Sequence, residues 1–203
     1  MRTALLRLVR PASAGLALAP GFIDTHSHAD RGIEDTPDAA SQVRQGITTE
    51  VIGVDGLSYA PIGDPADLEA LVHMNAGLDD APPQAAPYDW STVESYLDRL
   101  DGLRPSVNLA YLVGNSALRI CAVGWDDAPI APRDLGRMRA ILREAMEEGA
   151  YGMSTGLDYP PGSYASTEEV IAVPDFPRTA SGKVQKFRLR QQLRDRADGP
   201  KSI

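Results

Sequence analysis

The sequence contains little cysteine and lysine and no long apolar run, and these shortages exclude some classes of protein. Because Cys121 is the only cysteine, the chain has no internal disulfide and fits a reducing compartment, so we expect a cytoplasmic protein. No apolar run approaches the roughly 20 residues that cross a bilayer. Arg7 and Arg10 interrupt the apolar stretch at the amino terminus, which argues against a secretory signal. We expect no membrane and no nucleic acid as partner.

Lysine is absent from the first 182 residues, and its three occurrences lie close to the carboxyl terminus. Residues 174–203 carry eight Lys or Arg against three Asp or Glu, whereas residues 1–173 carry 12 against 25. This change in composition predicts a boundary near residue 173. We expect an amino-terminal extension (1–19), a main region (20–172) and a basic tail (173–203).

The main region alternates β-like and helix-like segments, which predicts an α/β fold of parallel strands joined by crossover helices. Strands are expected at 22–26, 47–52, 107–113 and 151–155, and helices at 36–45, 65–76, 91–100 and 132–149. The helix after Ser91 is expected to start with a capping box formed by Ser91 and Glu94. A complete (β/α)8 barrel needs roughly 250 residues. Four units in 203 residues therefore predict a partial TIM-type barrel.

A candidate metal site lies at the end of the first expected strand, where Asp24, His26 and His28 alternate. Alternate residues of a strand project from the same face, so these side chains can converge on one ion. Imidazole suits a borderline metal such as zinc. The alternative is a pair of surface histidines without a ligand.

The segments around these residues resemble a known family. Residues 20–30 (PGFIDTHSHAD) resemble the first strand of the amidohydrolase superfamily. Residues 45–53 (QGITTEVIG) and 149–162 (GAYGMSTGLDYPPG) resemble the second and fourth strands of its N-acyl-D-amino-acid deacylase branch. The resemblance implies zinc bound by both histidines, and hydrolysis of a linear amide C–N bond of an N-acyl amino acid by zinc-activated water.

Asp55 stands where that branch commonly has a zinc-binding cysteine. A carboxylate can bind zinc, although it is a harder ligand than a thiolate, so the resemblance makes Asp55 a third candidate ligand. A turn residue beside Gly56 is the equal alternative. Cys121 follows the third strand and is expected to be a small buried apolar residue. The family often has histidine at Asn115, so no role is transferred to that residue.

Two further residues lie near the expected catalytic end of the barrel. Ser154 and Tyr159 are candidates to line an acyl or amino-acid pocket. Tyr159 can equally pack under the turn formed by Pro160 and Pro161.

The tail resembles a different family. Residues 173–190 (VPDFPRTASGKVQKFRLR) are similar to the extreme carboxyl end of acyl-CoA synthetases of the adenylate-forming superfamily. The lysine that matches Lys183 there contacts carboxylate and phosphate during adenylation. The alternative is a solvated basic tail, because the large nucleotide-binding domain of those enzymes has no counterpart here.

The amidohydrolase resemblance also implies groups that are absent after Val173: histidine ligands from a fifth and a sixth strand, and an aspartate general base from an eighth. Three hypotheses follow: a hydrolase of the D-aminoacylase type with incomplete machinery, a non-catalytic fusion or truncation remnant, and a ligase-related protein acting through Lys183. An open half-barrel would expose two sheet edges, which favours self-association.

Overall fold

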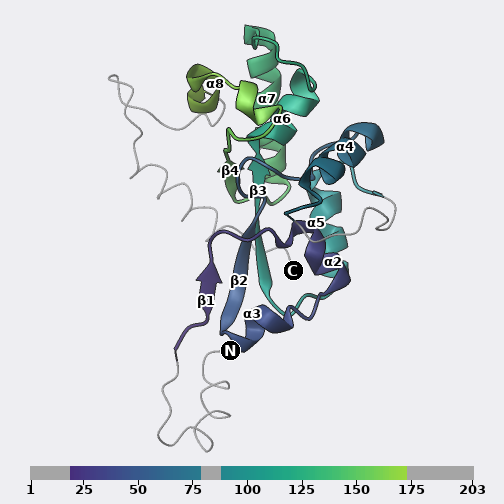
Figure 1. The fold of residues 1–203 in the computed structure, drawn as a ribbon, viewed down its shortest axis with the longest axis vertical. Coiled ribbons are helices and arrows are strands. Elements are labelled where there is room, and N and C mark those ends of the chain that lie inside the picture. Colours follow the sequence, from purple (N-terminus) through teal and green to yellow (C-terminus); the bar gives the residue numbers. More distant parts are fainter. Residues whose placement is uncertain (1–18, 79–87, 173–203) are drawn as a thin grey trace, which may run out of the picture.

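The computed structural model describes residues 19–78 and 88–172, which form one parallel four-stranded sheet with helices (Figure 1). The strands pair in sequence order, β1-β2-β3-β4. Their bounds are β1 Phe22–Asp24, β2 Ile47–Ile52, β3 Asn108–Gly114 and β4 Gly152–Ser154. The helices are α2 Ala29–Asp35, α3 Ala40–Arg44, α4 Pro65–Asn75, α5 Val93–Gly102, α6 Asn115–Ala122, α7 Pro132–Glu147, the 3₁₀ turn η1 Gly162–Tyr164, and α8 Thr167–Ala172. The expected α/β half-barrel is therefore confirmed.

The carboxyl ends of the four strands lie at the same edge of the sheet. Glu50 of β2 pairs with Asp24 of β1 and with Leu109 of β3, and Gly114 of β3 pairs with Ser154 of β4. Since every pairing is parallel, the segments that follow the four strands all leave from the carboxyl edge of the sheet. This is the edge at which (β/α) barrels place their functional loops.

The core fills the space between the sheet and its helices. Tyr96 of α5 and Tyr111 of β3 are fully buried, with ring centroids 5.2 Å apart. Helices α4 and α5 lie together on one side of β2 and β3 (Figure 1). The buried side chains they share with the sheet include Ile52, Leu68, Leu71, Leu100 and Val113. On the edge strand β1, by contrast, Phe22 and Ile23 are exposed.

Among the described α-helices, α2, α6 and α8 were not predicted from the sequence. Helix α2 follows directly on His28, and α6 begins at the residue after β3 with no turn between them. Six consecutive residues of α6, from Asn115 to Ile120, are buried, so its polar residues do not form a solvent-exposed face. Helix α3 begins at Ala40 rather than Thr36, because Ala39 adopts a left-handed conformation with φ of 42°.

The predicted capping box of α5 was wrong by one residue. Thr92, rather than Ser91, is the N-cap: its Oγ1 accepts from the Ser95 backbone N–H at 3.1 Å. Ser95 Oγ in turn accepts from the Thr92 backbone N–H at 3.1 Å. The Glu94 carboxylate takes no part in the box, and the Glu94 backbone N–H instead donates to the Glu148 carboxylate at 3.3 Å.

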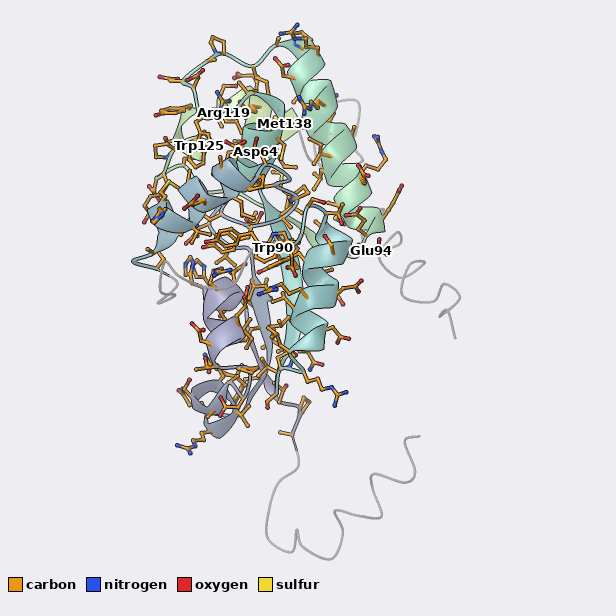
Figure 2. The ribbon with its side chains drawn as sticks, turned by 90° about the vertical axis from the view of Figure 1, so that its right-hand side faces the viewer. Asp64, Trp90, Glu94, Arg119, Trp125 and Met138 are labelled. Carbon is orange, nitrogen blue, oxygen red and sulfur yellow. The ribbon has the colours of Figure 1, made fainter. Side chains whose placement is uncertain are left out.

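Helix α7 packs on α6 through Met138, Leu142 and Ala145. Figure 2 labels Met138 of α7 and Arg119 of α6, whose side chains are both fully buried. Over the part of the chain that the structure describes, no helix is both long enough and apolar enough to cross a bilayer. The predicted domain boundaries, the cytoplasmic location and the self-association through sheet edges stay predictions.

Candidate metal centre

Two histidines leave the end of β1 on either side of a buried serine. Ser27 donates its backbone N–H to the Val51 carbonyl at 3.0 Å, which continues the β1–β2 pairing beyond the strand. The neighbouring side chains, His26 and His28, have ring centroids 5.4 Å apart with an interplanar angle of 69°. Asp24 does not join them, because its Oδ1 accepts from the His26 backbone N–H at 3.0 Å.

Asp55 reaches this pair from the turn after β2. Its Oδ2 lies 3.1 Å from His26 Nε2 and 3.3 Å from His28 Nε2. Asp55 has φ of 54°, a left-handed conformation that aspartate tolerates better than most residues. The two alternatives for Asp55 are therefore not exclusive: it is a turn residue, and the turn directs its carboxylate at both histidines.

The spacing of these three groups fits a small divalent cation. One ligand atom from each residue lies within 4.8 Å of the others. Bonds of about 2.0–2.2 Å to a tetrahedral zinc ion place two ligand atoms about 3.3–3.5 Å apart. The two measured contacts to Asp55 are close to that separation. Two imidazoles and one carboxylate also form a donor set that zinc accepts, so the residues present fit the ion.

The cluster is open on one side. The side chains of His26, His28 and Asp55 are 58%, 26% and 46% exposed. A cation held by three such groups would keep a coordination position accessible from solution. This openness is typical of a catalytic metal site, whereas a structural site encloses its ion with four protein ligands.

The loop that carries Asp55 is fastened to the ends of β3 and β4. We call residues 53–56 the Asp55 loop. Ser154, the last residue of β4, donates its hydroxyl to the Gly53 carbonyl and accepts from the Gly56 backbone N–H at 3.1 Å. From the other side, the Ser116 backbone N–H donates to the Gly56 carbonyl at 3.0 Å. The loop is therefore held between two neighbouring strands.

Close backbone packing reinforces this arrangement. A Cβ atom on Gly156 would overlap the Asp55 carbonyl, and one on Gly56 would overlap the side-chain amide of Asn115 and the backbone of Gly156. Asn115 Oδ1 also accepts from the Gly156 backbone N–H at 3.2 Å. Asn115 therefore has a clear structural contact. In the sequence, the one signal for this structural role of Asn115 is that glycine occupies positions 56 and 156, which the side chain contacts.

Other candidates lie apart from the cluster. Tyr159 is partly exposed beyond β4, and the pocket-lining roles of Ser154 and Tyr159 stay predictions. Cys121 is half-buried with its Sγ 3.5 Å from the Pro61 carbonyl oxygen, and burial raises the pKa of its thiol to about 11. It is not part of the cluster. Lys183 and the tail lie outside the described residues.

A buried carboxylate lies on β2 one strand away from the histidines. Glu50 is fully buried, and neither of its carboxylate oxygens has a hydrogen-bond partner among the described residues. Burial raises the pKa of Glu50, and the nearby Asp24 carboxylate raises it further. The polar side chains of Ser27 and Gln42 lie near the carboxylate without reaching hydrogen-bond geometry, and they offset only part of this increase.

Comparison with known proteins relates this geometry to characterised enzymes. Residues 13–176 match the amidohydrolase family. The N-acyl-D-aspartate deacylase of Alcaligenes xylosoxydans xylosoxydans is 39% identical over 183 residues, which are 88% of this chain and 34% of that protein. The D-aminoacylase of the same organism is 35% identical over 182 residues, 88% of this chain and 35% of that protein.

A solved structure supports the same relationship. The N-acyl-D-glutamate deacylase of Bordetella bronchiseptica was solved with zinc and a phosphonate inhibitor that mimics the tetrahedral intermediate. It matches this fold with a TM-score of 0.64 and 37% sequence identity, covering 76% of this chain and 31% of that one. This chain thus spans about a third of the length of the curated relatives it matches.

Proposed function

This chain belongs to the amidohydrolase family, and we propose that it forms the metal-holding part of an enzyme that hydrolyses the amide bond of N-acyl-D-amino acids. The observation that carries the proposal is the convergence of His26 Nε2, His28 Nε2 and Asp55 Oδ2 at the carboxyl edge of the sheet. The names of the relatives support the substrate class.

Zinc is the metal we propose for the site. When bound, it would polarise an amide carbonyl and lower the pKa of a water molecule. His26 and His28 would each offer an uncharged imidazole nitrogen. Asp55 would add a negative charge that partly balances the dication. Because all three side chains are partly exposed, an amide could approach the ion from solution.

The substrate pocket is proposed to extend from the metal toward the end of β4. Tyr159, partly exposed beyond that strand, offers an aromatic face to the acyl or amino-acid group. Ser154 is the second predicted lining residue. Neither has the chemistry of a general base at neutral pH, so we assign the proton transfer from water to neither residue.

Zinc binding by the purified chain tests the metal site. Isothermal titration calorimetry of the metal-free protein is expected to show one zinc ion per chain. His26→Ala and His28→Ala should each weaken binding by at least about tenfold, because each removes one of three ligands. His73→Ala is the matched control, since His73 lies on α4 with its imidazole 58% exposed. Equal binding by the wild type and the His26→Ala/His28→Ala double variant would refute the site.

Acetate release tests the reaction. The zinc-loaded chain is expected to release acetate from N-acetyl-D-aspartate, N-acetyl-D-glutamate or N-acetyl-D-methionine faster than from the L-enantiomers. The His26→Ala/His28→Ala variant should lose this release. Equal rates for that variant and the wild type would overturn the assigned activity.

A further inference from the structure

We infer that Ser154 is a positioning residue for the metal site: its hydroxyl holds the Asp55 loop so that the Asp55 carboxylate faces both histidines. This inference rests on the proposed function, and it adds a residue that touches neither the metal nor the three ligand side chains. Its basis is one pair of hydrogen bonds, from Ser154 Oγ to the Gly53 carbonyl and from the Gly56 backbone N–H to Ser154 Oγ.

The two bonds fall on opposite sides of Asp55 in the sequence. One fixes the carbonyl two residues before Asp55, and the other fixes the N–H one residue after it. A backbone segment fixed at both ends has little freedom to rotate between them. The direction of the Asp55 side chain is therefore set from β4, a strand that contributes none of the three ligands of the cluster.

The conformation of the loop explains why it needs this support. Asp55 has φ of 54°, and its glycine neighbours in the loop, Gly53 and Gly56, have φ of 72° and 73°. A left-handed conformation costs a non-glycine residue free energy and persists only when the surroundings impose it. The Asp55 side chain is nearly half exposed, so burial of that side chain does not fix the loop.

Ser154 uses its only hydroxyl proton for the bond to Gly53. In this conformation it has no proton left to donate to a substrate. The hydroxyl instead connects the loop after β2 to the end of β4. Gly56 and Ser154, which form one of the two bonds, are 98 residues apart in the sequence. Groups that orient metal ligands typically change metal affinity by about 10- to 100-fold when they are removed.

A double-mutant cycle separates this role from a general effect on folding. Zinc affinity is measured by calorimetry for the wild type, Ser154→Ala, Asp55→Ala and the double variant. Ser154→Ala is expected to weaken zinc binding about tenfold in the wild-type background and to have no effect when Asp55 is already alanine. Ser154→Thr keeps the hydroxyl and should recover most of the affinity. Ser163→Ala, at an exposed serine of η1, is the control.

Substitution of cobalt for zinc gives a second measurement. The visible absorption of bound Co²⁺ depends on its ligands, so Ser154→Ala should change the spectrum of the wild type and leave that of Asp55→Ala unchanged. Circular dichroism identifies a variant that does not fold; if Ser154→Ala is one, Ser154→Cys replaces it in the cycle, because a thiol is a weaker hydrogen-bond donor than a hydroxyl.

The outcomes distinguish the two proposals. A wild-type chain that binds no zinc refutes the proposed function and this inference with it. Histidine-dependent binding that Ser154→Ala leaves unchanged refutes only the inference. The same holds if Ser154→Ala weakens binding equally with and without Asp55, because its effect would then not pass through that carboxylate.

Discussion

Arg119 and Glu169 form a buried ion pair in which Nη1 of the arginine lies 2.7 Å from Oε2 of the glutamate, with side chains 0% and 2% exposed. The pair joins α6, which follows β3, to α8, which follows β4. Burial of two charges is costly unless each neutralises the other, so the two helices are coupled through this contact.

Arg119→Met is expected to lower the free energy of unfolding by about 3 to 5 kcal/mol, because it leaves the Glu169 carboxylate buried without its partner. The double variant Arg119→Met/Glu169→Leu should recover most of this loss by replacing both charges with apolar groups. Urea unfolding measures both. Arg133→Met serves as the control, since Arg133 is exposed. A double variant no more stable than Arg119→Met would contradict the expected coupling.

Tyr111→Phe is expected to destabilise the protein by about 1 to 3 kcal/mol. The hydroxyl of Tyr111 donates to the Ala60 carbonyl at 2.8 Å and accepts from the Ala60 backbone N–H at 2.9 Å. Phenylalanine would leave the buried Ala60 N–H unpaired, whereas the Ala60 carbonyl would keep its bond from the Ser58 hydroxyl at 3.0 Å. Burial raises the pKa of Tyr111 above its ordinary value. Urea unfolding measures the free energy of unfolding of Tyr111→Phe, and Tyr151→Phe, at an exposed tyrosine, is the control. Equal stability of the two variants would show that the hydroxyl is dispensable.

Glu50→Gln is expected to stabilise the protein at pH 7, by about 1 to 3 kcal/mol, because an uncharged amide costs less to bury than the charged form of a carboxylate. Burial, followed by the Asp24 carboxylate, raises the pKa of Glu50, so the folded state binds this proton more tightly than the unfolded state does. Wild-type stability should therefore fall as the pH rises from the unfolded pKa, about 4.3, through the raised folded pKa.

The difference between Glu50→Gln and the wild type should consequently shrink as the pH is lowered toward 4. Thermal unfolding between pH 4 and pH 8 measures it. Glu147→Gln, at an exposed position on α7, provides the matched loss of one carboxylate. A difference that does not vary with pH would mean that the carboxylate is not the cause.

Features of this fold that depend on neighbouring residues could be predicted from the sequence. The β-branched run at residues 47–52 matches β2 in full, because such side chains favour extended backbone. The spacing of His26 and His28 predicted a metal site; the two side chains lie together in the structure, and their role as ligands stays a prediction. The expected third member on the same strand, Asp24, was displaced by a hydrogen bond to the backbone of its neighbour.

The remaining features depend on contacts between distant segments, which local patterns do not encode. Ser154 was proposed as a pocket residue, and no periodicity indicates that its hydroxyl meets the Asp55 loop. Helix α6 packs against α7 and β3, and its polar residues Asn115, Ser116 and Arg119 are buried, so they do not mark a solvent-exposed face. For α5, Ser91 and Thr92 are both good caps, and the backbone path decided between them.

The hydrogen bonds between Ser154 and the Asp55 loop can form only after most of the described chain has been synthesised. They join residues 98 and 101 positions apart, so the ribosome completes both histidines and the aspartate long before it adds the serine that holds the loop in place. A nascent chain interrupted after β3 would carry every ligand of the cluster and still lack the restraint on one of them. The affinity of the cluster for a metal ion should therefore rise once β4 has been synthesised and has paired with β3.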